Sequence, residues 1–397
     1  MSDTAQVIAV RQDARPARLE VPFHKACLGT EELDGVAEAV KSGWITMGPK
    51  TVEFEKRFKS ALCGLSIPEA DLFAVCVNSA TAAMHLALKA IGLERGDEVI
   101  LPTNTFIATA EVVTYFGAVP VLCDIEEDTH NMSVSAMEKL ITPRTKAVIP
   151  VHFGGLPCDM DEIMAIARTR GLSVIEDAAH ALPSEYKGRL IGTIGDLTCF
   201  SFYATKTLAM GEGGMVVTAN EDYANRVKIN RLHGISRDAW DRYTLKGNWF
   251  YEVVDNGFKY NTTDIHAALG LAQLRKLYVM NSARARIAAA YDSAFADSQV
   301  TRPGLRPDRT TCRHLYVIKI GNRDELHEKL KQEGIGTSVH FVPVHRHPHY
   351  RKTYGYQDSD YPTANRVFEK ALSLPIYPDM TLEQVDHVCR SVLRHAR

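Results

Sequence analysis

Residues 73–123 read FAVCV NSATAAMHLALKAIGLERGD EVILP TNTFIATAEVVTYFGA VPVLC, and this stretch decides the fold. Short apolar runs typical of strands alternate with stretches in which apolar residues recur at helical spacing. The strand-like runs are Phe73–Val77, Glu98–Leu101 and Val119–Cys123, and the helical stretches are Thr81–Ile91 and Ala108–Phe116. Such alternation predicts βαβ units, so we expect an α/β protein with a mainly parallel sheet.

The same rhythm continues to about residue 218 and changes near residue 263. Strand-like runs at Ala147–Val151 and Leu172–Ile175 flank the helical pattern Met160–Arg170, whereas runs at 197–203 and 214–218 follow each other closely. A long helix-like stretch, 263–294, then leads into a shorter unit with one strand and two helices. We predict a loose N-terminal arm (1–20), a large domain (21–275) and a small C-terminal α+β domain (276–397).

Charge and composition exclude several classes of protein. The chain has 397 residues, with 46 basic and 48 acidic side chains and a net charge of −2. This balance argues against nucleic acid or a membrane as a partner, because both attract a basic surplus. No stretch reaches the roughly 18 apolar residues of a membrane helix, and the first residues lack a secretory apolar run. The eight scattered cysteines contain no C-x-x-C pair, which favours reduced packing residues in a cytoplasmic protein.

Two polar segments follow predicted strands, at the edge where ligands collect in open α/β sheets. One is EDAAH (176–180); the other is SFYATK (201–206), with GEGG following at 211–214. Lys206 is either a solvated charge or a reactive amine. Deprotonating a free lysine at pH 7 costs roughly 4–5 kcal/mol, and an imine formed with a cofactor aldehyde removes that cost for an incoming amine. Pyridoxal phosphate (PLP) is a cofactor of this kind.

PLP requires three further parts, and the sequence offers a candidate for each. Asp177 can keep the pyridine nitrogen protonated; the alternatives are a helix cap and a surface ion pair. The segment NSAT (78–81) lies between a predicted strand and a helix, where N–H groups bind phosphate, although Ser and Thr are also ordinary helix caps. Phe106 can stack on the ring or belong to the core.

Two other kinds of site fit the sequence less well. Four of the fifteen histidines, His340, His345, His347 and His349, cluster near the C-terminal domain. They have no neighbouring cysteines and form no H-E-x-x-H pattern, so we expect ligand or interface contacts and no metal. The glycines at 211–214 continue as Met-Val without the third glycine of a dinucleotide-binding loop.

Taken together, the segments resemble the fold-type-I, PLP-dependent nucleotide-sugar aminotransferases of the DegT/StrS family. The resemblance runs from VPF (21–23) to LPIYP (374–378). It rests on SGWITMGP (42–49), NSATAAMHLAL (78–88), GDEVILP (96–102), IEDAAHA (175–181), SFYATK (201–206), GEGG (211–214), YNTTDIHAALGLAQL (260–274) and GIGTSVHFVPVH (334–345). It implies an aspartate aminotransferase-like fold and PLP as the cofactor.

The resemblance also implies roles for individual residues. Lys206 is expected to be the Schiff-base lysine, Asp177 the pyridinium partner and Ser201 a phosphate ligand. The other implied cofactor contacts are Ala80, Thr81, Phe106, His180 and Asn261, and the residues expected to meet the substrate are Thr46, Arg237, His345 and Tyr350. Asn261 matches a phosphate contact that the family delivers from the neighbouring subunit, which implies a homodimer with shared active sites.

Within the family, HGISRDAWDRY (233–243) and GFKYNTTDI (257–265) are similar to the branch that makes 4-amino sugars, including UDP-4-amino-4-deoxy-L-arabinose. His180 points the same way, because C4-aminating members tend to carry His at this position and C3-aminating members Gln. The implied reaction moves an amino group from L-glutamate to the C4 keto group of a dTDP- or UDP-linked sugar. The alternatives are C3 amination, a PLP sugar dehydratase and a non-catalytic regulator; the last two are expected to lose Lys206 or Asp177, which this chain retains.

Overall fold

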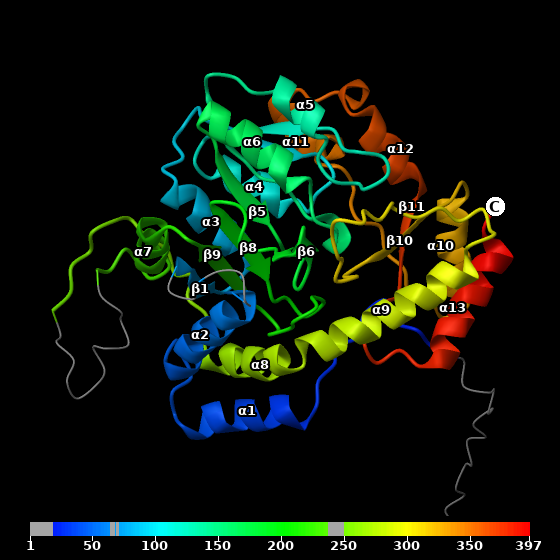
Figure 1. Ribbon diagram of the computed structural model, residues 1–397, viewed down its shortest axis with the longest axis horizontal. Helices are drawn as coiled ribbons and strands as arrows, with labels where there is room; N and C mark the ends of the chain where they lie inside the picture. The colour runs from blue at the N-terminus through cyan, green and yellow to red at the C-terminus, as the bar shows by residue number, and fades with distance from the viewer. Residues whose placement is uncertain (1–18, 64–67, 69–70, 237–249) are drawn as a thin grey trace, which may run out of the picture.

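The computed structural model describes residues 19–63, 68, 71–236 and 250–397. At its centre lies a seven-stranded sheet with the order β1-β9-β8-β5-β4-β2-β3 (Figure 1). The strands are β1 Phe73–Val77, β2 Glu98–Pro102, β3 Val119–Cys123, β4 Thr145–Val148, β5 Ser173–Asp177, β8 Leu197–Ser201 and β9 Gly214–Thr218. The pairs between β3 and β8 are parallel, and only β9 is antiparallel to its neighbours β1 and β8. The predicted α/β fold is confirmed, and the close succession of two runs after residue 197 is the antiparallel β8–β9 pair.

Helices cover both faces of the sheet, because successive side chains of a strand point to opposite sides. Val75 and Val77 of β1 pack with α3 (Ala80–Ala90), α4 (Ala108–Thr114) and α7 (Glu221–Asn230). Cys76 of the same strand packs toward α2 (Pro49–Cys63), α6 (Met160–Arg170) and α8 (Asp264–Arg275). The remaining elements of this part are α1 Thr30–Lys41, α5 Val134–Lys139, η2 Phe153–Gly155 and the ribbon β6 Glu185–Tyr186 with β7 Arg189–Leu190. Each face of the sheet therefore has its own apolar core.

The long helix expected over 263–294 is two helices. α8 ends at Arg275, Lys276 has φ −106° and ψ 8°, and α9 runs from Leu277 to Ala294. Figure 1 shows α9 leaving the large sheet and running diagonally to the C-terminal elements. We therefore propose Lys276 as the boundary between the large and the small domain.

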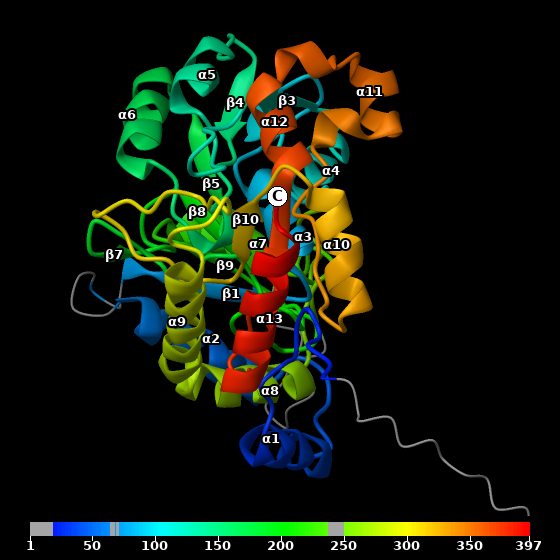
Figure 2. The ribbon, with the colours of Figure 1, turned by 90° about the vertical axis from the view of Figure 1, so that its right-hand side faces the viewer.

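A third apolar core holds the C-terminal unit together. It combines α9 with β10 (Tyr316–Lys319), β11 (Ala371–Leu374), α10 (Arg323–Gln332) and α13 (Leu382–His395), and it includes Val21 from the N-terminal segment. Figure 2 shows α9 and α13 side by side against this unit. The remaining elements are η4 Val344–Arg346, α11 Pro348–Tyr354, η5 Asp358–Asp360 and α12 Pro362–Lys370. The order of one strand followed by helices matches the expected α+β pattern, with β11 added as the partner of β10.

Two further observations concern the chain as a whole. All eight cysteines are free thiols, and all except Cys27 are buried. Among the described residues, no helix is both long and apolar enough to span a membrane. Of the predicted N-terminal arm, only Leu19 and Glu20 lie within the described residues.

Candidate active site

A cavity of about 420 Å³ opens at the carboxyl ends of β5 and β8, beside the start of α3. It brings together seven of the residues that the sequence singled out. These are Ala80, Thr81, Phe106, Asp177, His180, Ser201 and Lys206. They come from four separate segments of the chain, and the strand order of the sheet makes them neighbours.

Lys206 lies in the turn that follows β8, where its backbone N–H donates to the carbonyl of Tyr203 at 2.9 Å. The side chain faces the cavity and keeps some exposure there, but protein surrounds it on its other sides. This burial lowers the pKa of Lys206 to about 8, and the nearby charge of Asp177 opposes part of the shift. A lysine of this kind is not the solvated charge that the sequence left open.

Asp177 ends β5 and is only 5% exposed. Its Oδ2 accepts a hydrogen bond from Thr109 Oγ1 at 2.8 Å, and its Oδ1 accepts one from the backbone N–H of Ala179 at 3.1 Å. Thr109 also hydrogen-bonds Thr105 at 2.7 Å, which fixes its hydroxyl. Burial raises the pKa of Asp177, while these two donors and the charge of Lys206 favour the carboxylate. The geometry excludes a surface ion pair and suits a carboxylate that faces a ligand's cationic nitrogen.

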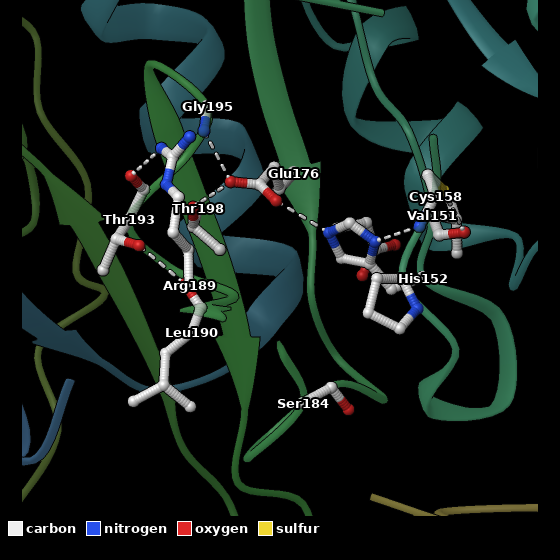
Figure 3. Close-up of polar contacts among 12 residues, drawn as sticks. Val151, His152, Cys158, Glu176, Ser184, Arg189, Leu190, Thr193, Gly195 and Thr198 are labelled. Carbon is white, nitrogen blue, oxygen red and sulfur yellow. Dashed lines mark hydrogen bonds and ion pairs between the residues drawn. The ribbon is translucent and has the colours of Figure 1, made fainter. Parts of the chain in front are cut away.

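Glu176, the residue before Asp177, fixes the end of β5 through a buried hydrogen-bond network. Glu176 is fully buried and accepts hydrogen bonds from His152 Nε2 (2.8 Å), Gly195 N (2.7 Å) and Thr198 Oγ1 (2.9 Å), as Figure 3 shows. His152 Nδ1 accepts from Cys158 N at 3.1 Å, so the ring is neutral and carries its proton on Nε2. A Cβ at Gly195 would lie 2.9 Å from Glu176 Cγ, so only glycine fits there. The network holds the strand end that presents Asp177.

The start of α3 forms a cradle for an anion. Ser79 is the N-cap and accepts from Ala82 N at 3.0 Å, and the first-turn residues Ala80 and Thr81 line the cavity. Gly214 of β9 lies against this turn so closely that a Cβ would be 2.5 Å from the Ser79 carbonyl carbon. The free N–H groups and the positive end of the helix dipole are suited to a phosphate. Ser201 lines the cavity as well.

Aromatic rings and imidazoles form the remaining walls. Phe106 lines the cavity and is 58% exposed, so it is not a core residue. His180 is buried, and its Nδ1 accepts from Gly154 N at 3.3 Å, which leaves the proton on Nε2. Burial lowers the pKa of His180 well below its usual range, so the ring is neutral. Its ring centroid lies 4.4 Å from that of His314.

The structure does not bring every expected residue to this cavity. His345 is fully buried: its Nδ1 bonds Thr103 Oγ1 at 2.7 Å and its Nε2 bonds Asn365 at 3.1 Å. Tyr350 of α11 is 5% exposed and belongs to the same apolar core as Val75 and Val77. Neither side chain lines the cavity in this structure, and contact of these two residues with the substrate stays a prediction.

Two further candidates, Thr46 and Asn261, belong to segments that a backbone hydrogen bond joins. Thr46 is exposed, and its carbonyl accepts from the backbone N–H of Asp264 at 3.0 Å, three residues after Asn261. Asn261 Nδ2 donates to the Thr262 carbonyl at 2.9 Å, and its buried Oδ1 has no partner. Neither residue lines the cavity of its own chain. Arg237, the remaining substrate candidate, lies outside the described residues.

The sequence interpretation missed several residues of the cavity. Thr109 is the donor to Asp177, and no pattern in the sequence distinguishes it from other threonines of the segment. His24, from the N-terminal segment, bonds the Ala204 carbonyl at 2.9 Å, two residues before Lys206. His314 also lines the cavity, and no local pattern in the sequence distinguishes it from a packing histidine. His340, one of the four clustered histidines expected to contact a ligand or an interface, lines the cavity as well.

A buried lysine and a buried carboxylate that face one cavity, with an anion cradle beside them, define a PLP site on an α/β scaffold. The model of the DegT/DnrJ/EryC1/StrS aminotransferase family matches residues 26–393. The spore coat polysaccharide biosynthesis protein SpsC of Bacillus subtilis is 47% identical over 380 residues, which cover 94% of this chain and 96% of SpsC.

Solved structures of similar proteins match this chain over nearly its whole length. Spr1654, a sugar aminotransferase described as putative, from Streptococcus pneumoniae, in its PMP form, superposes with a TM-score of 0.87 at 34% identity, covering 94% of this chain and 98% of that one. DesV of S. venezuelae gives a TM-score of 0.85 at 34% identity, with the same coverage of 94% and 98%. The chain belongs to the DegT/DnrJ/EryC1/StrS aminotransferase family. It is a PLP-dependent sugar aminotransferase, as the resemblance of the sequence predicted.

Proposed function

We propose that the enzyme transfers the amino group of L-glutamate to the C4 keto group of a dTDP- or UDP-linked keto-sugar. The observation that carries transamination is that Lys206, largely surrounded by protein, and the buried Asp177 line one cavity. A lysine with a pKa of about 8 is deprotonated at pH 7 for about 1.4 kcal/mol, against roughly 4–5 kcal/mol for a free one. By lowering the pKa of Lys206, burial therefore makes it easier for the amine to act as a nucleophile and as a base.

The residues of the cavity fit PLP. The start of α3 and Ser201 are positioned to hold its phosphate, Asp177 to hold the proton on its pyridine nitrogen, and Phe106 to cover its ring. When bound, PLP supplies the electron sink that allows an amino acid to lose its α-proton. In this proposal Lys206 Nζ removes that proton from glutamate, and in the second half-reaction it delivers a proton to C4 of the sugar.

Selection of C4 is assigned to the His180 side of the cavity. His180 is neutral and carries its proton on Nε2, so the ring is a hydrogen-bond donor for an oxygen of the cofactor or the sugar. The resemblance to the C4-aminating branch, whose members tend to carry His at this position, supports the assignment. C3 amination is the competing reaction, and the substrate test below separates the two.

The proposal includes a homodimer with shared active sites. Asn261 and Thr46 do not line the cavity of their own chain, and Asn261 Oδ1 is buried without a hydrogen-bond partner. Phe106 and Tyr203, at the cavity, remain exposed. A second copy of the chain that covers this side would bury the aromatic rings and bring Asn261 to a phosphate. The eight free thiols fit a reducing compartment, and we place the enzyme in the cytoplasm.

The deciding experiment offers the purified enzyme matched 3-keto and 4-keto nucleotide sugars, UDP- and dTDP-linked, with glutamate. We expect glutamate-dependent amination of the 4-keto compounds, with the new C–N bond located by NMR. A preference for 3-keto sugars would overturn the C4 assignment and leave sugar transamination intact. Absence of glutamate-dependent turnover on any of them would overturn the choice of donor or substrate.

A further inference from the structure

Arg284 of α9 is a buried cation without a buried anion. It is 2% exposed, and its Nη1 donates to the carbonyl of Ile376 at 2.7 Å. Its Nε is buried and has no hydrogen-bond partner, and no carboxylate within the described ranges pairs with the guanidinium. Buried arginines are normally paired because an isolated charge is costly to remove from water. An unpaired one suggests that a ligand supplies the missing anion.

Arg284 lies directly behind one wall of the PLP cavity. Ile376, whose carbonyl it holds, lines the cavity, and so do His24 and His314. Burial is the main reason that the pKa values of His24 (to about 4) and His314 are lowered, and the positive charge of Arg284 adds to both shifts. His314 Nδ1 is buried and, like Arg284 Nε, has no partner. Two buried polar atoms on this side of the cavity therefore have no hydrogen-bond partner.

We propose that His314 and Arg284 form the subsite for the carboxylate of the amino-acid donor, an inference that rests on the proposed function. The α-carboxylate of an amino acid is bonded to the carbon that carries its amino group, so it must lie within a few ångströms of the group that Lys206 serves. The charged side chains lining the cavity are Lys206, Asp177 and Glu212. The carboxylate of the donor would be repelled by the carboxylates of Asp177 and Glu212, so a second cation besides Lys206 is needed. Arg284, behind this wall of the cavity, can supply that positive charge.

The nucleotide diphosphate is a poorer occupant for this subsite. It is attached at C1 of the sugar, and the sugar ring separates it from C4, the carbon that must reach Lys206. The diphosphate therefore lies nearer the mouth of the cavity when C4 is at the lysine. The cofactor phosphate has its own cradle at the start of α3.

A purely structural role for Arg284 is testable because the chain contains a matched control. Tyr291, on the same helix, donates its hydroxyl to the Pro375 carbonyl at 2.9 Å, next to the bond between Arg284 and Ile376. Both side chains hold the segment 375–376 to α9. Only Arg284 adds a charge.

The experiment compares holoenzyme variants Arg284→Gln, Arg284→Lys, His314→Gln and Tyr291→Phe. The probe is glutarate, a dicarboxylate with no amino group, and its dissociation constant is measured from the change in cofactor absorbance. We expect Arg284→Gln and His314→Gln to weaken glutarate binding by about tenfold or more, the loss typical of a hydrogen bond to a charged group. Arg284→Lys should recover part of the affinity. The KM for the keto-sugar should change by less than about threefold in all four variants, since a tenfold change marks a lost contact.

Equal weakening of glutarate and sugar binding in Arg284→Gln and Tyr291→Phe would overturn the proposal in favour of a structural role. Unchanged glutarate binding in Arg284→Gln and His314→Gln would overturn it as well. His314→Gln leaves α9 intact, so it decides the matter if Arg284→Gln fails to fold. Wild-type enzyme that transaminates no sugar with glutamate marks failure of the proposed function, whereas failure of this inference leaves wild-type turnover untouched.

Discussion

Thr109 Oγ1 lies 2.8 Å from Asp177 Oδ2, and both groups are buried. The threonine is the side-chain donor that the structure gives this carboxylate, and its own position is fixed by Thr105. In a buried site such a donor favours the ionised form of the acid. It therefore supports the role of Asp177 as partner of a protonated pyridine nitrogen.

Thr109→Val should lower kcat/KM for glutamate by about tenfold or more, because a hydrogen bond to a charged group contributes about 1.5–3 kcal/mol. Affinity for PLP, measured by absorbance titration of the cofactor-free protein, should fall as well. Thr114→Val is the matched control, since Thr114 Oγ1 of the same helix donates only to the Glu111 carbonyl. Equal effects of the two substitutions would show that helix packing, and not the carboxylate, is responsible.

Lys206→Ala should abolish transamination and leave the fold intact. The side chain faces the cavity, so its removal enlarges the cavity and leaves the three apolar cores unchanged. Turnover and circular dichroism, measured on the same preparation, check both statements. Lys187→Ala, which removes an exposed lysine paired with Asp161, serves as the control and should keep full activity. Substantial residual turnover in Lys206→Ala contradicts the assignment.

Glu176→Gln should destabilise the protein by about 1.5–3 kcal/mol, the range for a hydrogen bond to a charged group. The glutamine amide would place N–H groups against His152 Nε2, which already carries a proton because Nδ1 accepts from Cys158. If the amide is turned over, its N–H groups face the backbone N–H of Gly195 instead. Either the contact with His152 or the contact with Gly195 is therefore lost. Urea unfolding measures the effect, and Glu53→Gln, which alters an exposed i,i+4 pair, should change the unfolding free energy by less than about 1 kcal/mol.

Asn261→Ala should weaken retention of PLP although Asn261 does not line the cavity of its own chain. The reason is the proposed delivery of its side chain across a dimer interface. Equilibrium dialysis gives the affinity, sedimentation gives the assembly state, and Asn256→Ala at an exposed turn is the control. A fully active monomer, or unchanged PLP affinity in Asn261→Ala, is incompatible with the proposal.

The order of strands and helices was readable from the sequence because it depends on local periodicity. The apolar runs from Phe73 to Cys123 alternate with helical spacing, and the carboxyl ends of parallel strands meet at one edge. That rule alone placed Asp177 and Lys206 in one site. The start of α3 was readable for the same reason, since Ser79 caps a helix directly after a strand.

Only the tertiary structure decided which other side chains reach the cavity. In the sequence, nothing distinguishes His345 from His314 as a ligand contact. In the structure, both ring nitrogens of His345 are hydrogen-bonded in the core, to Thr103 and Asn365. His314 lines the cavity, and its Nδ1 has no partner. Nothing in the sequence indicates that the charge of Arg284 is unpaired. The guanidinium is removed from water only because α9 packs on the segment 375–376. Local pattern determines the elements, whereas contacts between residues far apart in the chain determine which polar groups are left free for a ligand.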